Sequence, residues 1–278
     1  MDGLISKIQR YSTKDGPGIR STVFAVGCNL RCKWCSNPEL LEEGKIFYHK
    51  ERCVKCGACE KYNSPEERAA VCFHDVYEHV GTLISAEVLA SKLLRDNAFY
   101  VQSGGGVTFS GGEPVLQKEF FLETTRLLKS ESVHVALDTA GHVPWDSLLP
   151  LVEAADLVLY DIKAIDETLH KQLTGAGNSL ILENAGKIAG MKKPMVIRTI
   201  LVPGVNDAEE EISRRLEFIS SLGAAGLDIL KYHRLGAGKY LMLGKDYPAA
   251  DVPECPDELA ERVMLKARSM GLTVTIGG

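Results

Sequence analysis

Three cysteines on one short segment are the residues of this 278-residue chain most able to do chemistry. Cys28, Cys32 and Cys35 lie in GCNLRCKWCSN, residues 27–37, at C-x3-C-x2-C spacing. A structural zinc site is closed by four protein ligands, and a cysteine-held iron–sulfur cluster also normally takes four. Three ligands therefore leave one coordination position open for chemistry, unless a remote fourth ligand completes a structural zinc knuckle.

Four more cysteines form a second group, Cys53, Cys56, Cys59 and Cys72. Their C-x2-C-x2-C spacing, followed by a more distant cysteine, is more typical of ferredoxin-like clusters, although four cysteines also bind structural zinc. The surrounding residues 47–82 show little hydrophobic periodicity, and so short a segment cannot bury a sufficient core. We interpret it as an insert that folds around a metal site. The eighth cysteine, Cys255, is expected to pack near a C-terminal helix.

The composition limits the classes of function. The chain is 45% hydrophobic and 25% charged, which is ordinary for a globular protein, and it carries a net charge of −5. The charge provides no global basic field for nucleic acid or an anionic membrane, and no apolar run could span a bilayer. The N-terminal residues lack the apolar core of a signal peptide, so we expect a cytoplasmic protein. In that compartment, clustered cysteines indicate metal ligands rather than disulfides.

The elements that must position these cysteines follow an alternating pattern. Near-continuous apolar runs typical of buried parallel strands are each followed by a helical pattern. The runs are residues 21–26, 106–110, 133–138, 157–161, 195–202 and 227–233, with a further strand at 272–276. This α/β alternation predicts either a partial (β/α)6 barrel or a doubly wound open sheet. Asn206 or Asp207 is predicted to cap the helix that follows the fifth run, and Gly223 to end it.

Both architectures bind ligands at the carboxyl ends of their parallel strands. Polar groups of this chain fall at four such ends: the SGGEP segment at 110–114, Asp138, the YDIK segment at 160–163, and His233. The cysteine loop follows the first strand. The sequence therefore predicts that these groups and the three cysteines converge on one mouth.

Five motifs in order resemble the glycyl-radical-enzyme activating enzymes of the radical S-adenosylmethionine (SAM) superfamily. They are DGPGIRSTVFAVGCNLRCKWCSN at 15–37, SGGEP at 110–114, YDIK at 160–163, VIRTILVPGVND at 196–207 and KYHRLG at 231–236. The resemblance covers nearly the whole chain. It implies a partial (β/α)6 TIM-like barrel made of residues 1–46 and 83–278, with a small cysteine-rich, ferredoxin-like insert at 47–82.

The resemblance also answers why a fourth cysteine is missing. It implies that Cys28, Cys32 and Cys35 hold a 4Fe–4S cluster whose fourth iron is ligated by SAM. One electron from the reduced cluster then cleaves SAM to methionine and a 5′-deoxyadenosyl radical, which takes a hydrogen from a glycine Cα of a partner enzyme. The implied partners are a glycyl radical enzyme and flavodoxin or ferredoxin as electron donor, and we expect a monomer. Two alternatives stay open: a radical SAM enzyme acting on another peptide or small molecule, and a non-catalytic iron–sulfur or zinc-binding module.

Residue roles are implied by the same motifs. Lys163 joins the three cysteines as a catalytic-site residue, and with His233 it would bind the SAM carboxylate. Gly111 and Gly112 would let backbone carbonyls approach the SAM ammonium. The whole implied SAM-contacting set is Trp34, Cys35, Ser36, Gly111, Gly112, Glu113, Asp138, Asp161, Ile162, Lys163, Arg198 and His233. Trp34 either contacts adenine or packs against the barrel rim.

Further ligands are implied near this set. Asp138, Thr139 and Asp161 match positions around a monovalent cation beside SAM. Asp15 and Gly16 would contact the partner's glycyl loop, although Asp15 is equally well placed as a turn aspartate.

In the insert, Cys53, Cys56, Cys59 and Cys72 would hold one auxiliary 4Fe–4S cluster, where many activating enzymes carry two. Because a pyruvate formate-lyase activator would lack such an insert, we expect a different glycyl radical enzyme as partner.

Overall fold

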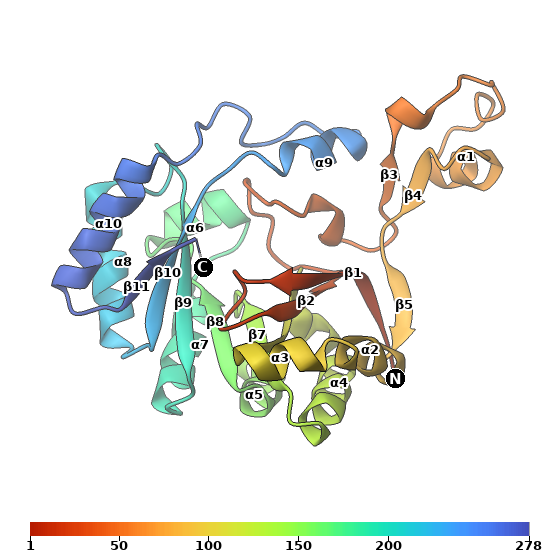
Figure 1. Cartoon of the computed structure of the whole chain (residues 1–278). Coiled ribbons are helices and arrows are strands. Elements are labelled where there is room, and N and C mark those ends of the chain that lie inside the picture. The colour runs from red at the N-terminus through yellow and green to blue at the C-terminus, as the bar shows by residue number, and fades with distance from the viewer. Residues whose placement is uncertain (278) are drawn as a thin grey trace.

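A curved, nine-stranded sheet forms the centre of the computed structural model, which describes residues 1–277 (Figure 1). The strand order is β11-β10-β9-β8-β7-β6-β2-β1-β5. The parallel strands are β2 (Arg20–Ala25), β6 (Gly106–Gly111), β7 (His134–Thr139), β8 (Leu157–Asp161), β9 (Met195–Leu201), β10 (Gly226–Lys231) and β11 (Val274–Ile276). At one edge, β1 (Asp2–Ser12) pairs antiparallel with β2 and with β5 (Thr82–Ser85).

The order of the parallel strands decides between the two predicted architectures. From β2 and β6 to β11 the strands are neighbours in the order in which they occur along the chain. A doubly wound sheet reverses its order at a switch point, whereas a barrel-type sheet does not. The partial-barrel prediction is therefore confirmed, with the sheet open between β5 and β11.

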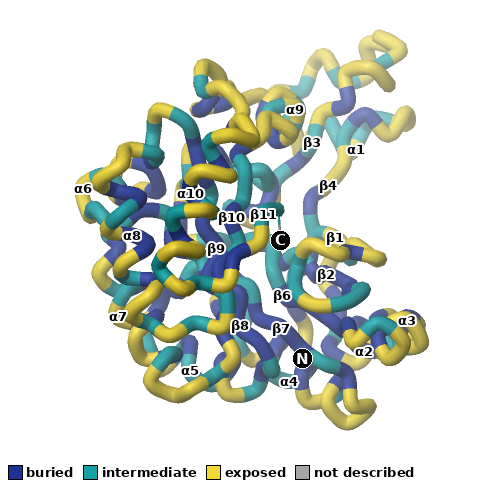
Figure 2. Tube along the Cα trace, turned by 60° about the vertical axis from the view of Figure 1, so that its left-hand side comes forward, coloured by how far each residue is buried: buried dark blue, intermediate teal, exposed yellow. Residues whose placement is uncertain are grey.

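Helices cover the outer face of this sheet, and the main hydrophobic core lies between the two layers. Phe109 of β6 and Phe121 of α4 illustrate the contact, with ring centroids 4.6 Å apart. Figure 2 shows buried strands beneath helices whose outer faces are exposed. The helices are α2 (Ala86–Leu94), α3 (Asn97–Ser103), α4 (Lys118–Ser130), α5 (Trp145–Ala154), α6 (Glu167–Thr174), α7 (Ser179–Gly190), α8 (Glu209–Ser221), α9 (Ala237–Met242) and α10 (Asp257–Ser269), with 3-10 turns η1 (Pro38–Leu40) and η3 (Pro114–Gln117).

Residues 46–79 form a cysteine-rich lobe that stands away from the barrel (Figure 1). Its base is a two-stranded antiparallel sheet of β3 (Ile46–Tyr48) and β4 (Tyr77–His79). Between them lie the 3-10 turn η2 (Lys50–Arg52) and α1 (Pro65–Val71), and no residue of η2 or α1 is buried. A capping box of Ser64 and Glu67 begins α1. The lobe thus lacks the core that would fold it by burial alone.

Two local predictions differ from the structure. The strand β1 was not predicted, and α8 is capped by Ala208 rather than by Asn206 or Asp207. The Asn206 side chain instead accepts from the Val202 N–H at 2.9 Å and donates to the Lys163 carbonyl at 3.0 Å, which fixes the loop before the helix. Gly223, at φ +61°, directly follows the helix cap as predicted. Within residues 1–277 no helix is long and apolar enough to cross a membrane.

Candidate active site

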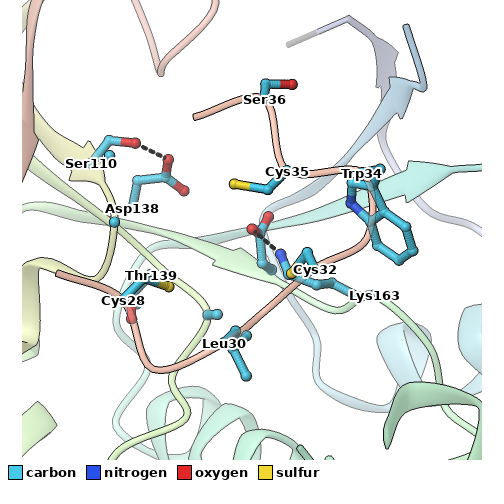
Figure 3. A pocket seen from close by; sticks show the side chains of 14 residues that line it. Cys28, Leu30, Cys32, Trp34, Cys35, Ser36, Ser110, Asp138, Thr139 and Lys163 are labelled. Atoms are coloured by element: carbon cyan, nitrogen blue, oxygen red, sulfur yellow. Dashed lines mark hydrogen bonds and ion pairs between the residues drawn. The ribbon is translucent and has the colours of Figure 1, made fainter. Parts of the chain in front are cut away.

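A cavity of about 170 Å³ opens at the carboxyl ends of β6, β7 and β8, beside the cysteine loop (Figure 3). Most of the side chains predicted to converge do line it. They are Cys28, Cys32, Trp34, Cys35, Ser36, Gly111, Gly112, Asp138, Asp161 and Lys163. Ser110, Thr139, Leu30 and Ala140 complete the wall. The structure therefore brings together residues from four distant segments of the chain, 28–36, 110–112, 138–140 and 161–163.

The cysteine loop is held by backbone hydrogen bonds to the carboxyl end of α6. The Arg31 N–H donates to the Thr174 carbonyl at 2.7 Å, and the Lys33 N–H donates to the Leu173 carbonyl at 3.0 Å. These bonds satisfy helix-end carbonyls that would otherwise lack partners. They also fix the backbone from which the three thiols project.

Burial raises the pKa of each of the three thiols, Cys28, Cys32 and Cys35, to about 11. A thiol must lose its proton to ligate a metal, so cluster assembly here would release protons. In the part of the chain that the structure describes, no three His, Cys, Asp or Glu side chains converge on a point that one metal ion could occupy. The three sulfurs instead border a cavity, which fits a group larger than an ion.

Two glycines bring β6 against the cysteine loop. A Cβ on Gly112 would lie 2.1 Å from the Gly27 carbonyl oxygen, and Gly111 adopts φ +101°. The Glu113 N–H also donates to the Gly27 carbonyl at 2.7 Å. Only glycine fits at position 112, because a side chain there would push the two walls of the cavity apart.

Glu113 lies behind the cavity wall rather than in it. Its carboxylate is 1% exposed and accepts from the Thr139 hydroxyl at 2.8 Å and from the Ala140 N–H at 3.2 Å. Burial raises the pKa of Glu113 to about 7. The side chain therefore holds the two residues that do line the cavity beside Asp138.

Asp138 carries the charge on that side of the cavity. It accepts from the Ser110 hydroxyl at 2.6 Å (Figure 3) and from Arg198 at 3.1 Å. Burial raises the pKa of Asp138 to about 6, with Arg198 opposing the rise and Asp161 adding to it. Arg198 is also 3.6 Å from Asp15, so it lies between the cavity wall and the loop that contains Asp15 and Gly16.

Lys163 and Asp161 form an ion pair at the carboxyl end of β8, the strand next to β7, with Nζ and Oδ2 2.6 Å apart (Figure 3). Burial disfavours the ammonium, but Asp161 and the neighbouring Cys32 and Cys28 outweigh it, so that the pKa of Lys163 is raised. Between the two, Ile162 is fully buried and its N–H donates to the Arg198 carbonyl at 2.9 Å. A fixed positive charge thus faces the cysteines.

Trp34 lines the cavity and also joins the main hydrophobic core, where it is 6% exposed. Its ring points away from Ser110 and Asp138 (Figure 3). Both interpretations of this side chain, as an adenine contact and as packing at the rim, are consistent with that position.

Four predicted residues lie outside the cavity: Ile162, Glu113, Arg198 and His233. The first three contact its wall from behind. His233 is exposed, and its Nδ1 accepts from the Leu235 N–H at 3.3 Å. Ser110 lies in the SGGEP motif and lines the cavity, and its place at a strand end is the sequence signal that indicates it.

Asp15 lies apart from the cavity on the loop before β2. Its Oδ2 accepts from the hydroxyls of Ser12 and Thr22, both at 2.7 Å, and Gly16 follows at φ +115°. These bonds anchor the loop, as expected of a turn aspartate.

The four lobe cysteines, Cys53, Cys56, Cys59 and Cys72, line a second cavity of about 220 Å³. His74, Tyr48 and Tyr77 line the same cavity. The donor set is therefore four thiols around a volume, with an imidazole and two phenols at its edge.

Comparison with known proteins gives one consistent family. Residues 22–216 match the family described as the radical SAM superfamily. The chain is 35% identical to the trans-4-hydroxy-L-proline dehydratase activating enzyme of Clostridioides difficile, over 100% of both chains. It is 34% identical to the choline trimethylamine-lyase activating enzyme of Oleidesulfovibrio alaskensis, covering 98% of this chain and 97% of the relative. It is also 34% identical to the pyruvate formate-lyase 2-activating enzyme of Escherichia coli, covering 99% and 92%.

Solved structures agree with the fold. A domain of the pyruvate-formate lyase-activating enzyme from Bacteroides vulgatus matches with a TM-score of 0.54 and 30% identity, covering 63% of this chain and 100% of that one. A radical SAM methyltransferase from Sphaerobacter thermophilus matches with a TM-score of 0.59 over 98% of this chain and 76% of that one. At 13% identity, the second match concerns the fold alone.

Proposed function

The chain belongs to the radical SAM superfamily and, within it, to the activating enzymes of glycyl radical enzymes, and from this premise we propose that it installs a glycyl radical on a partner enzyme. The observation that carries the proposal is the convergence of Cys28, Cys32 and Cys35 with Asp138 and Lys163 on one cavity. The pattern of three thiols without a fourth suits a cluster that keeps one position for a substrate.

The cofactor of this superfamily is a 4Fe–4S cluster, which when reduced supplies the electron that splits SAM into methionine and a 5′-deoxyadenosyl radical. This chain's residues would bind and orient SAM. The carboxylate of Asp138 would bind the ammonium group of SAM, and the ammonium of Lys163 would bind its carboxylate group. Gly111 and Gly112 let the end of β6 pack against the backbone of residues 24–27, and their carbonyls would approach the SAM ammonium. The site would then hold the partner's glycine so that its Cα hydrogen is transferred, which would give 5′-deoxyadenosine and the glycyl radical.

The proposal extends to further ligands and partners of the site. A monovalent cation would sit beside SAM among Asp138, Thr139 and Asp161, which line one side of the cavity. Asp15 and Gly16 would receive the partner's glycyl loop. We also propose a flavodoxin or ferredoxin as electron donor, a monomeric state, and a cytoplasmic location, where thiols stay reduced.

The lobe is proposed to be an insert of residues 47–82 on a barrel made of residues 1–46 and 83–278. Its four thiols would hold one auxiliary 4Fe–4S cluster. A cavity of about 220 Å³ bordered by all four supports a cluster over a single zinc ion, whose sulfur ligands lie at about 2.3 Å. Such a cluster would brace the lobe and would not bind SAM.

The relatives do not identify which glycyl radical enzyme is the partner of this chain. Their names refer to a hydroxyproline dehydratase, a choline trimethylamine-lyase and a pyruvate formate-lyase 2, all at 34–35% identity. We keep the preference for an enzyme other than pyruvate formate-lyase as a prediction. The relative named for pyruvate formate-lyase 2 matches almost the full chain, so chain length does not argue against that partner.

The test uses the anaerobically reconstituted protein with SAM, dithionite and purified candidate glycyl radical enzymes labelled with deuterated glycine. We expect deuterium in 5′-deoxyadenosine and an organic radical signal on one candidate by electron paramagnetic resonance. A Cys32→Ala variant should give neither. If SAM is cleaved but deuterium enters 5′-deoxyadenosine only when a separately labelled small molecule or peptide replaces the candidate enzymes, the alternative radical SAM activity replaces this proposal.

A further inference from the structure

The short helix α9 is bound directly to the segment that follows Cys35. The Lys239 ammonium lies 2.6 Å from the Asn37 Oδ1 and 2.6 Å from the Glu39 Oε1. Lys239 is about 200 residues further along the chain than these partners. The contact therefore joins the cysteine loop, which follows β2, to the segment that follows β10.

The fit between the two segments is close. A Cβ on Gly236, at the start of α9, would lie 2.9 Å from the Ser36 Cα and 3.0 Å from the Cys35 carbonyl oxygen. The backbone of α9 thus rests on the residue that carries the third thiol. A side chain at position 236 would therefore push α9 away from Cys35 and Ser36.

Lys239 neutralises the buried carboxylate of Glu39 at this contact. The Glu39 side chain is 4% exposed, and its Oε2 has no hydrogen-bond partner in residues 1–277. In that part of the chain, the Lys239 ammonium is the one cation that pairs with Glu39 within 4 Å. Removing one partner of a buried pair leaves an uncompensated charge, which disturbs the segment that holds it.

The helix also contacts the lobe. It packs against η1, which contains Glu39, and against β3 at the base of the lobe. In Figure 1, α9 occupies the side of the barrel that faces the lobe. The segment from Cys35 to β3 is therefore held along its length by one short helix.

We propose that Lys239 is a positioning residue for the SAM-binding cluster, which acts through Asn37 and Glu39 to fix Cys35 at the cavity. The proposal rests on the assignment of Cys28, Cys32 and Cys35 as cluster ligands, and it does not depend on which partner is activated. Lys239 touches neither the cavity nor its contents.

The experiment compares Lys239→Met with Lys245→Met in the anaerobically reconstituted full chain. Lys245 is exposed and lies in the same segment, which makes it a matched control. The readouts are iron per chain, the change in the cluster's electron paramagnetic resonance spectrum on adding SAM, and KM and kcat for 5′-deoxyadenosine formation with dithionite. Lys239→Arg keeps the charge and tests rescue.

We expect Lys239→Met to retain its iron but to show a weakened SAM-induced spectral change and a KM for SAM raised about tenfold or more, in line with the loss of hydrogen bonds to a charged group. Lys239→Arg should recover most of the affinity, and Lys245→Met should equal the parent. Parent-like spectra and KM in Lys239→Met would overturn the proposal.

Two further outcomes are decisive. If Lys239→Met does not fold, Glu39→Gln takes its place, since it removes the same charge pair while keeping the shape. A folded Glu39→Gln protein with parent-like SAM binding would overturn the positioning role. If the parent itself shows no SAM-induced spectral change, the cysteine-site assignment fails, and that failure is distinct from a failure of Lys239 alone.

Discussion

Arg198 on β9 reaches across β8 to Asp138 on β7, and their side chains form an ion pair of 3.1 Å with both partners nearly buried. The same guanidinium is 3.6 Å from Asp15 on the loop before β2. One side chain thus links the charged wall of the cavity to the loop proposed to meet the partner. The pair also explains how the Asp138 carboxylate keeps its charge near neutral pH, because Arg198 opposes the effect of burial on its pKa.

Replacing Arg198 with Met should make stability depend on pH. Without the guanidinium, the pKa of Asp138 in the folded state rises further above its unfolded value. The unfolded state then loses this proton at a lower pH than the folded state does, so the free energy of unfolding falls as pH increases. We expect a loss of about 3 kcal/mol at pH 7, typical of breaking a buried pair, and a much smaller loss near pH 4.5. Denaturant unfolding of the apoprotein at both pH values measures the difference. Equal losses at the two pH values would contradict the explanation.

Glu113 should impose a second pH dependence on the apoprotein. The pKa of Glu113 in the folded state, about 7, lies above its unfolded value. Its contribution to the stability of the folded state is therefore fully present below about pH 4.5 and is lost as pH rises to 7. Glu113→Gln removes this titration. We therefore expect the variant to gain stability relative to the parent between pH 5 and pH 8, measured by thermal unfolding. Glu119→Gln, at an exposed position of α4, should show no such gain.

The three-thiol cluster gives the most direct chemical prediction. Cys32→Ala should abolish reductive SAM cleavage and lower the iron content by about four per chain, because two cysteines cannot hold the cluster. Chromatographic detection of 5′-deoxyadenosine and iron analysis check both effects. Cys255→Ala is the control, since the Cys255 side chain is buried, with 7% exposed, and lies outside both cavities. Parent-like turnover in Cys32→Ala would show that the assignment is wrong.

Lys163 and His233 were predicted together as partners of the SAM carboxylate, and the structure separates them. Lys163 lines the cavity, whereas His233 is exposed outside it. We expect Lys163→Met to weaken SAM binding by about 1.5–3 kcal/mol, the range for hydrogen bonds to charged groups. His233→Ala should cost less. Calorimetry on the reconstituted variants tests both, and an equal loss in the two would place His233 back in the site.

Most of the sheet could be predicted from the sequence, because parallel strands buried on both faces consist of near-continuous apolar residues. The run at Leu157–Asp161 matches β8 at both ends, and the others differ by a residue or two. The strand β1 was missed because it lies near the sheet edge and because its apolar residues Leu4, Ile5 and Ile8 neither form a continuous run nor alternate strictly with polar ones. The four-residue β5 is too short to leave a pattern.

The same reasoning predicted site residues where topology alone brings them together. Asp138 and Lys163 follow from strand ends that share one edge of the sheet. His233 was predicted by the same rule, but β10 already ends at Lys231, and the neighbouring Tyr232 is buried with its hydroxyl 2.9 Å from that of Tyr247, so that His233 is exposed outside the cavity. The pair of Lys239 and Glu39 had no sequence signal, since it joins α9 and η1, two short elements about 200 residues apart whose approach depends on packing of the whole barrel.

The lobe provides the final prediction. If Cys53, Cys56, Cys59 and Cys72 hold an auxiliary 4Fe–4S cluster, the parent should carry about eight irons, and Cys53/Cys56/Cys59→Ala about four. The variant should lose the fold of the lobe, because metal binding supplies the energy that its missing core cannot. The barrel should still bind SAM. Proteolysis between β3 and β4 would report the unfolding, and anaerobic iron and zinc analysis the metal.

A particular iron and zinc content would contradict the auxiliary cluster. About four irons in parent and variant alike, with one zinc lost on mutation, would make the lobe a zinc-stabilised element. In that case the four sulfurs must move together around a single ion, since within residues 1–277 no such set of side chains converges closely enough to hold one. The cavity of about 220 Å³ between them would then have to close, and Tyr48 and Tyr77, which line it, would shift with the thiols. A 4Fe–4S cluster would occupy more of that cavity than one ion does, which is why we expect the iron result.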